Sequence, residues 1–433
     1  MKIINLLKKL RNNLFFFPAL PFVIIIFLIS RLLQSFLLIR VGRIVTERIG
    51  HFAGNIEVYL LEKIYNIDQP SKMTIDIWFI DNDISNEFLK LLIIEKLIIG
   101  PRFIFKYVYR LNKIFSKKNK SIKQYSMYKD INVKNSKFNS DSKFIIPQRS
   151  DRDIYSLRSN TEPLMRFSDS QIVEAKKKLE KFGITNRNKY VALMVRDSSY
   201  LSKTYKDQDW NYHNYRDCEI DNYLLAAEFL TQKGFHVLRM GKFVNKSLIT
   251  NNKMIIDYAN SNLRSDFLDI YIGATCEFCI STGNGYDKIP AMFRRPIVFC
   301  DHAPIGNYPT YMPQSIGIFK HYFSITENKK INLSEIVAKK SHLFHINEQF
   351  KNAGIKLVDN SPEEIKDVCS EMVDRLSNNW VENKSDIILQ KKFWECYPSK
   401  YSQTYFHSPK LYHKKISSKI GAIFLRNNIN LIR

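Results

Sequence analysis

A turn rich in glycine and hydroxyl side chains follows one of the most apolar segments of the chain. The segment 276–280 is predicted to be a buried strand, 287–294 can form a helix, and 296–300 is a second apolar strand. The turn between them consists of Ser281, Thr282, Gly283, Asn284 and Gly285. A turn that joins a strand to a helix start offers free backbone N–H groups at the positive end of the helix, which suits a phosphate group. The turn alone is equally compatible with an ordinary βα connection that needs glycine for its backbone angles.

Three cations are predicted to lie at the same edge of the sheet as this turn. Arg196 follows an apolar strand at 190–195, Lys242 follows another at 235–240, and Arg216 lies between these strands. Open α/β sheets bind ligands at the carboxyl ends of their strands. The three cations could therefore converge with the turn on one diphosphate, although each alone would more often be a surface cation.

The composition indicates a globular chain of more than one domain. At 433 residues the chain exceeds one small core, and 45% of its residues are hydrophobic. The formal net charge is +24, from 66 Lys and Arg against 42 Asp and Glu. No zinc-finger, helix-turn-helix or RNP-type signature accompanies this charge. We therefore expect acidic ligands or an anionic membrane surface as partners, and no nucleic acid.

Strands and helices alternate in both halves of the chain, which predicts an α/β protein of two Rossmann-like, doubly wound domains. The predicted strands are 36–44, 74–80, 190–195, 235–240, 276–280 and 296–300, and the predicted helices are 56–64, 85–99, 168–182, 222–232, 287–294 and 361–376. The predicted parts are a membrane-associated segment at 1–35, an N-terminal domain at 36–165 with a polar insertion near 116–143, a C-terminal domain at 166–378, and a helical tail at 379–433 that packs back on the N-terminal domain.

An uncharged, apolar run at 14–30 indicates attachment to a membrane. Basic residues flank it on both sides, its 17 residues are at the lower limit for a spanning helix, and Pro18 and Pro21 interrupt its start. No small-residue cleavage site follows, so a signal peptide is not favoured. We expect an interfacial or membrane-embedded segment with the body of the protein in the cytoplasm, and a single span is the alternative.

Two patterns in the sequence could bind a metal. Asp81 and Asp83 follow the strand 74–80 and resemble the D-x-D element with which some glycosyltransferases bind a divalent cation. Cys276 and Cys279 have C-x-x-C spacing, but they lie within a predicted buried strand, which favours core thiols in a reducing cytosol. Because the phosphate-suited residues lie in the other half of the chain from the aspartates, we expect a solvated turn there, no metal and no cofactor.

Four sets of motifs resemble those of glycosyltransferases from bacterial surface-carbohydrate gene clusters, such as those for capsule and O-antigen. They are 48–52 (RIGHF), 195–201 (VRDSSYL), 213–217 with 221–223 (HNYRD and DNY), and 360–365 (NSPEEI). The resemblance implies a GT-B-like fold with an acceptor-side N-terminal half and a C-terminal half that binds a nucleotide-sugar. It implies transfer of a sugar to a growing glycan or lipid-linked acceptor at the cytoplasmic face of the inner membrane.

Such a transfer needs a base for the acceptor hydroxyl and cationic or N–H groups for the departing phosphate. The best candidate base is His51, which lies between two glycines in a polar loop predicted at 46–55. A structural or capping histidine is equally consistent with that position. Glu47 and Asp197 are alternative bases, and Asp197 could instead orient Arg196 through an ion pair.

Two other functions use similar residues. A pyruvyl or phosphate transferase of polysaccharide biosynthesis would need the same cationic site, and a non-catalytic, membrane-associated assembly factor would need no donor at all. Binding or hydrolysis of a nucleotide-sugar by the purified protein separates the enzymes from the assembly factor.

Overall fold

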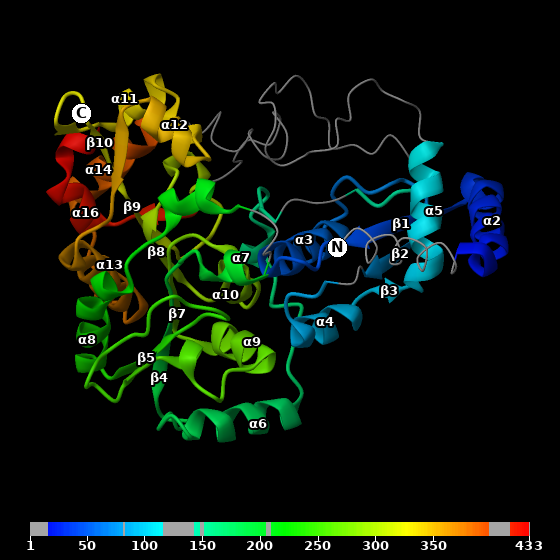
Figure 1. Ribbon diagram of the computed structural model, residues 1–433, viewed down its shortest axis with the longest axis horizontal. Helices are drawn as coiled ribbons and strands as arrows, with labels where there is room; N and C mark the ends of the chain where they lie inside the picture. Colours follow the sequence, from blue (N-terminus) through cyan, green and yellow to red (C-terminus); the bar gives the residue numbers. More distant parts are fainter. Residues whose placement is uncertain are drawn as a thin grey trace. The chain divides into compact units, whose positions relative to one another are not determined.

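The chain forms two compact units, Met1–Asp151 and Arg152–Arg433. The computed structural model describes residues 16–80, 83–115, 143–147, 151–204, 209–397 and 416–432 (Figure 1). The division differs from the boundary expected near residue 165. The segment before residue 166 belongs to the second unit because Arg294 holds it there. The Arg294 guanidinium donates from Nε to the carbonyl of Thr161 (2.7 Å) and from Nη2 to the carbonyl of Glu162 (3.2 Å).

The first unit is built on a small parallel sheet. Its elements are α2 (Phe16–Leu32), β1 (Leu37–Ile44), α3 (Ile49–Ile64), β2 (Met73–Ile80), α4 (Glu87–Ile94), β3 (Ile98–Ile99) and α5 (Arg102–Ile114). The strands lie in the order β1-β2-β3, and all pairs are parallel. A single parallel bridge joins Val41 to Ile145 on the other side of β1. The expected α/β class is confirmed, but the described part of this unit has fewer strands than a full doubly wound domain.

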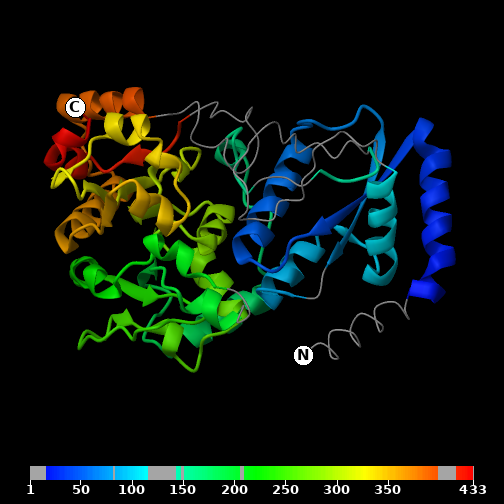
Figure 2. The same cartoon turned by 45° about the horizontal axis from the view of Figure 1, so that its top comes forward.

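Helices cover both faces of this sheet. On one face Trp78 of β2 meets Tyr59 of α3 edge to face, with ring centroids 4.8 Å apart. On the other face Val41 and Phe79 pack with α2 and α5 in one buried cluster. Alternate residues of a strand point to opposite faces, which explains why Trp78 and Phe79 belong to different cores. Figure 2 shows α5 (cyan) and α2 (blue) on the side of the sheet away from α3.

Two expectations for the first unit were wrong in detail. The segment expected as a loop at 46–55 becomes helical from Ile49, so His51 lies in the first turn of α3. Gly54 is needed for close packing, because a Cβ there would lie 2.7 Å from Cβ of Asp151. The helix expected at 85–99 ends at Ile94, and the last residues pair with β2 as β3. Residues 116–142 of the expected insertion lie outside the described residues.

The second unit contains a seven-stranded sheet. Its strands are β4 (Lys189–Met194), β5 (Phe235–Arg239), β6 (Ile255–Ile256), β7 (Phe278–Ser281), β8 (Ile297–His302), β9 (Ile316–Phe319) and β13 (Lys419–Ile420). They lie in the order β13-β9-β8-β7-β4-β5-β6, and every pair is parallel. The first six in chain order therefore follow the 3-2-1-4-5-6 pattern of a doubly wound fold, which reverses direction between β4 and β7.

Helices of the second unit complete this pattern. They are α6 (Asp169–Glu180), α7 (Ser199–Thr204), α8 (Leu224–Gln232), α9 (Asp266–Thr275), α10 (Lys288–Met292) and α13 (Pro362–Leu376). The helices α8 and α13 pack together on one face of the sheet, and α9 and α10 pack together on the other (Figure 1). A smaller antiparallel sheet has the order β11-β10-β12, from β10 (His321–Ser324), β11 (Lys329–Lys330) and β12 (Ile355–Val358); α11 (Leu333–Ala338) and α12 (Asn347–Asn352) lie between its strands in the sequence.

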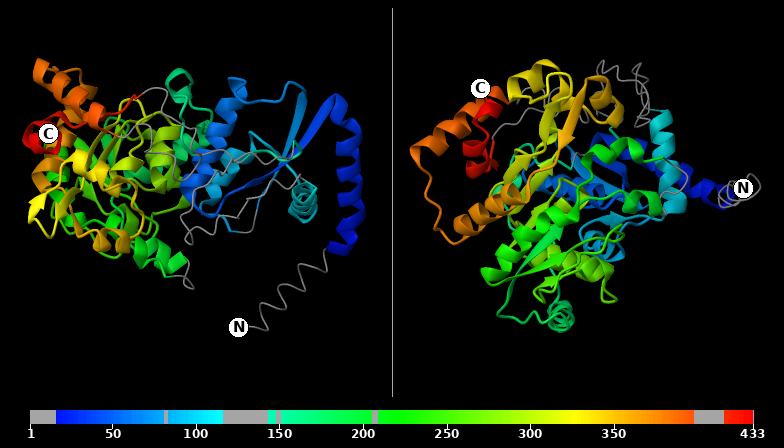
Figure 3. Two further views of the ribbon diagram at one scale, coloured as in Figure 1. Left: turned by 90° about the horizontal axis from the view of Figure 1, so that it is seen from above. Right: turned by 60° about the vertical axis from the view of Figure 1, so that its left-hand side comes forward.

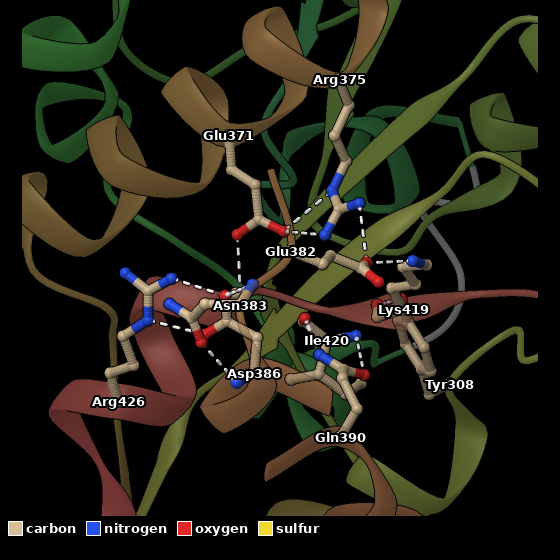
Figure 4. A network of polar contacts seen from close by, with 11 residues as sticks. Tyr308, Glu371, Arg375, Glu382, Asn383, Asp386, Gln390, Lys419, Ile420 and Arg426 are labelled. Atoms are coloured by element: carbon tan, nitrogen blue, oxygen red, sulfur yellow. Dashed lines mark hydrogen bonds and ion pairs between the residues drawn. The ribbon is translucent and has the colours of Figure 1, made fainter. Parts of the chain in front are cut away.

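The described residues of the tail pack on the second unit, in place of the expected N-terminal domain. They form α14 (Lys384–Cys396), β13 and α16 (Ala422–Asn427), which lie beside α13 and β9 (Figure 3, right). Figure 4 shows the polar contacts that hold them. Arg426 binds both carboxylate oxygens of Asp386 (2.7 and 2.6 Å), and Glu371 of α13 accepts from the backbone of Ala422 (2.7 Å) and from Arg375 (2.8 Å). Contacts that cross from α13 to the tail include the bond from Ala422 to Glu371 and that from Arg375 to Glu382 (3.0 Å), and these hold the tail on this unit.

Candidate functional site

The strand order of the large sheet reverses between β4 and β7, and this brings two predicted parts of the site together. Arg196 follows β4 and the turn at 281–285 follows β7, and these strands are direct neighbours. The backbone N–H of Arg196 donates to Oγ1 of Thr282 (3.1 Å), and the N–H of Thr282 donates to the carbonyl of Met194 (3.3 Å). Doubly wound sheets open a crevice at this point, outside the carboxyl ends of the strands. The structure therefore brings Arg196 and the turn together at this edge, and ligand binding there stays a prediction.

The turn is shaped by bonds within itself. The hydroxyl of Ser281 bonds the carboxylate of Asp287 and accepts from the N–H of Gly283 (3.1 Å). Asn284 accepts from the N–H of Tyr286 (2.9 Å), just before the short 3-10 helix that begins at Gly285. The Ser281 and Thr282 hydroxyls are thus occupied within the protein. A direct part of these hydroxyls in donor binding stays a prediction.

Glycine at 283 is required for two reasons. Its φ is +75°, in the left-handed region that side chains with a Cβ avoid. A Cβ there would also lie 2.6 Å from Cδ2 of His302, which leaves β8 beside the turn. This close approach identifies His302 as a further residue of the site.

Two arginines contribute positive charge that the protein leaves incompletely paired. The Arg196 side chain is only 10% exposed, and its Nε lies 3.6 Å from Oδ1 of Asp217, longer than a hydrogen bond. Arg216 donates from Nη2 to the carbonyl of Gly283. Among the described residues, Nη1 of Arg196 and Nε of Arg216 are buried with no hydrogen-bond partner. Burial and the nearby charge of Arg216 lower the pKa of Arg196 to about 10.

The same positive charges lower the pKa values of two buried histidines. Burial, together with the charges of Arg216, Arg152 and Lys288, lowers the pKa of His302 to about 3. Burial and the charges of Arg216 and Arg152 lower the pKa of His345 to about 3 as well. Both imidazoles are therefore neutral at physiological pH. A site where three cationic side chains act on two neutral histidines is suited to an anionic ligand.

The structure gives Asp197 and Lys242 other contacts. The two carboxylate oxygens of Asp197 accept from the backbone N–H groups of Ser199 and Asn245, both at 2.9 Å, and so join the loops after β4 and β5. The ion pair expected between Asp197 and Arg196 is formed by Asp217 instead. Lys242 is one-third exposed and pairs with Asp266 at the start of α9 (3.9 Å). The role of Lys242 in donor binding stays a prediction.

A cavity of about 380 Å³ lies beside Arg196 on the β5 side of the edge. Its lining includes Val195, Asp197, Asp217, Cys218, Glu219 and Asp359. The volume lies within the range of small-molecule pockets, and carboxylates are the usual acceptors for ribose hydroxyls. The cavity therefore offers carboxylates for hydroxyl groups, beside the cations Arg239 and Lys246, which also line it.

One group of potential metal ligands occurs among the described residues. Cys218, Asp301 and Asp359 place their ligand atoms within 4.8 Å of one another. The ammonium of Lys320 lies 2.7 Å from Asp359 and supplies the positive charge that a metal would supply. Burial raises the pKa of the Cys218 thiol well above its ordinary value, which keeps it protonated and a poor ligand. Asp81 of the D-x-D triplet lies outside the described residues, so its role stays untested.

Solved structures that are similar to this chain include two glycosyltransferases. No family model matches the chain, and no curated protein matches it. A family 9 glycosyltransferase from Veillonella parvula is 10% identical, with 65% of this chain and 85% of that chain covered and a TM-score of 0.35. The ADP-heptose LPS heptosyltransferase II of E. coli is 11% identical, with 64% and 90% covered and a TM-score of 0.31. At these TM-scores the likeness carries no conclusion about substrate or site residues.

The predicted base and the predicted donor residues belong to different units. His51 is half-buried on α3 of the first unit, whereas Arg196, Arg216 and the turn belong to the second. Glu47 forms an ion pair with Arg43, which occupies it locally. A catalytic role for His51 stays a prediction.

Sequence reasoning missed four residues of the cluster. They are Arg152, Lys288, His302 and His345. His302 could have been predicted, because it ends the apolar strand β8, just as Arg196 follows the apolar strand β4. Lys288 begins the helix predicted after the turn and was not considered, whereas Arg152 and His345 come from segments whose position depends on long-range packing.

Proposed function

We propose that the protein is a nucleotide-sugar-dependent glycosyltransferase of the GT-B type and that its second unit binds the donor. The observation that carries this proposal is that Arg196 and Arg216 each have a buried nitrogen without a hydrogen-bond partner among the described residues. Both residues bond the glycine-rich turn, at the point where the strand order of the doubly wound sheet reverses. The motif resemblance to glycosyltransferases of surface-carbohydrate synthesis supports the same function.

In this proposal the donor lies along the carboxyl edge of β4. Its diphosphate contacts the arginines and the backbone of the 283–285 turn, and the nucleoside enters the adjacent 380 Å³ cavity, where Asp217 or Glu219 accepts from the ribose hydroxyls. Buried cations with unused N–H groups form strong charge-assisted hydrogen bonds with phosphate. They therefore stabilise the negative charge that develops on the departing diphosphate, without a metal ion.

The acceptor side is proposed for the first unit. His51, on the first turn of α3, would remove the proton from the acceptor hydroxyl as the glycosidic bond to the diphosphate breaks. The acceptor is a growing surface glycan or a lipid-linked sugar. The N-terminal apolar helix would hold the enzyme at the cytoplasmic face of the inner membrane, where such acceptors are extended.

A thermal-shift panel of sugar nucleotides tests the proposal. A ligand that binds only the folded protein stabilises it by about 2.7 kcal/mol at 100 times its Kd, so one nucleotide class should raise Tm at millimolar concentration. Free monosaccharides should not. Arg196→Ala should lose the shift, whereas Arg187→Ala, which removes an exposed arginine before β4, should keep it. The proposal is wrong if no sugar nucleotide shifts the parent protein, or if both variants respond alike.

A further inference from the structure

The helix α2 has two apolar faces, and only one of them is covered. Ala19 and Val23 are buried on the inner face and belong to the core cluster shared with α5. On the outer face the side chains at helical spacing are exposed: Phe22 by 57%, Ile25 by 52%, Leu28 by 52% and Leu32 by 76%. The segment Pro18–Ser35 is long and apolar enough to cross a membrane by length and composition. What covers its outer face must therefore be apolar too.

The carboxyl end of α2 is fastened to the rest of the first unit. Arg31 donates from Nη2 to Oδ1 of Asn112 on α5 (2.9 Å). Its guanidinium also lies 3.4 Å from the ring centroid of Phe144 and 4.2 Å from that of Phe27. Burial lowers the pKa of Arg31, yet the group stays charged at neutral pH. The helix is thus an integral part of the fold, packed along α5 (Figures 1 and 2).

The partner helix α5 is basic. Between Arg102 and Ile114 it carries four basic residues and no acidic ones, and α2 has no acidic residue either. Arg110 and Lys113 are exposed, as are the apolar residues Phe103 and Ile114. A basic amphipathic helix with aromatic residues is typical of segments that lie at the interface of an anionic membrane.

This packing is incompatible with a transmembrane α2. A spanning helix is surrounded by hydrocarbon, but α2 is packed against α5, so the cations of α5 would enter the bilayer with it. Each Lys or Arg at the bilayer centre costs about 2.5–3.5 kcal/mol even by the lowest scale.

We infer that α2 and α5 together form a docking surface for an anionic lipid bilayer, in which α2 lies in the plane of the membrane. The surface consists of Phe22, Ile25, Leu28 and Leu32 on α2 with Arg110 and Lys113 on α5. The apolar side chains enter the boundary between headgroups and acyl chains, and the cations contact lipid phosphates. The inference rests on the membrane attachment in the proposed function and specifies how it is made, but it does not depend on sugar transfer.

Flotation of the full-length protein with lipid vesicles tests the surface. We expect binding to vesicles of phosphatidylcholine with phosphatidylglycerol, and weaker binding to phosphatidylcholine alone or at high salt. The triple variant Phe22→Gln, Ile25→Gln, Leu28→Gln should bind at least roughly tenfold more weakly, since each 1.4 kcal/mol changes affinity tenfold. The matched control Val173→Gln, Ile249→Gln, Val381→Gln removes exposed apolar residues of the second unit and should bind like the parent.

A second pair of variants tests the charges. Arg110→Gln with Lys113→Gln should weaken binding to anionic vesicles by roughly tenfold or more, because a basic residue near an anionic surface contributes about 1 kcal/mol. Lys176→Gln with Lys177→Gln, which removes two exposed lysines of α6, should have no such effect. This pair remains informative if the triple variant lowers Tm, since it leaves α2 unchanged.

Three results would overturn the inference. The first is equal flotation of the parent and both test variants. The second is protease protection of an amino-terminal tag in proteoliposomes whose carboxyl-terminal tag is cleaved, which would show that α2 spans the bilayer. The third is a parent protein that ignores vesicles but dimerises in solution, with the triple variant monomeric, which would assign the outer face of α2 to a second copy of the chain.

Discussion

Each unit contains a buried arginine, and the two arginines are paired very differently. In the first unit Arg40 binds both carboxylate oxygens of Asp76, each at 2.6 Å, and Tyr59 donates to the same carboxylate at 2.6 Å. In the second unit Nε of Arg196 lies 3.6 Å from Oδ1 of Asp217, its ion-pair partner among the described residues, and a second arginine lies nearby. Both side chains are buried, but only Arg40 has the geometry of a closed pair.

The difference separates a structural charge from a binding charge. A buried ion pair is stable when its hydrogen-bonding groups are satisfied, as they are for Arg40 and Asp76. A buried guanidinium with an unused N–H group costs free energy unless a ligand completes it. The second unit therefore retains an arrangement that folding alone does not favour, which is typical of functional sites.

Matched substitutions of the two arginines should give the largest contrast. Arg40→Met leaves the Asp76 carboxylate buried without its partner and should lower the free energy of unfolding by about 3–5 kcal/mol. Arg196→Met removes a loosely paired charge that Arg216 repels, and it should change the free energy of unfolding by less than about 1 kcal/mol. Urea unfolding of the full-length protein measures both values. Equal losses would mean that Arg196 is structural.

The division of labour between the units can be tested through His51. If His51 is the base, His51→Ala should reduce transfer by roughly 10²–10⁴-fold. Donor affinity should stay the same, because the donor contacts lie in the second unit. Initial rates and donor titration with the same protein preparation check both points. Parental turnover, or a joint loss of donor binding and thermal stability, would make His51 structural.

The buried histidine His302 should make the second unit sensitive to acid. Its folded pKa of about 3 lies below the ordinary value of 6.5, so between these values the unfolded chain binds a proton that the folded chain excludes. Stability is therefore lost as pH falls. Relative to His302→Asn, the parent should lose about 2 kcal/mol of unfolding free energy between about pH 7.5 and about pH 5.

The comparison with the variant is needed because other groups act in the opposite sense. Burial raises the pKa of Asp269, Asp287 and Asp301 to about 6, so these carboxyls favour the folded state as pH falls. Both proteins contain them, so their effect cancels in the difference. Parallel pH profiles for parent and variant would show that His302 is not buried among cations.

Chelation should have the smallest effect. Because two arginines and the turn neutralise the departing diphosphate in the proposal, transfer should continue in EDTA at the parental rate. Loss of activity that Mg²⁺ or Mn²⁺ restores would instead favour the D-x-D residues Asp81 and Asp83 in the first unit.

The fold of the second unit was more predictable than that of the first. Apolar strands such as 190–195 and 276–280 are marked by composition, and parallel strands bring their carboxyl ends to one edge, so Arg196 could be placed beside the turn. The start of α3 was missed because Gly54 resembles a loop former, although its role is close packing against Asp151. The position of the tail was missed because it depends on contacts with α13 between residues far apart in sequence, such as Ala422 and Glu371.

Calorimetric titration with inorganic pyrophosphate tests the central claim most directly, namely that Arg196 and Arg216 bind a diphosphate group. The double variant Arg196→Ala, Arg216→Ala should bind at least roughly 100-fold more weakly than the parent, since a hydrogen bond to a charged group contributes about 1.5–3 kcal/mol. The control Lys176→Ala, Arg187→Ala removes the same charge from the exposed surface of this unit and should bind like the parent. Equal affinity of the double variant and the parent, with both folded, would contradict the claim.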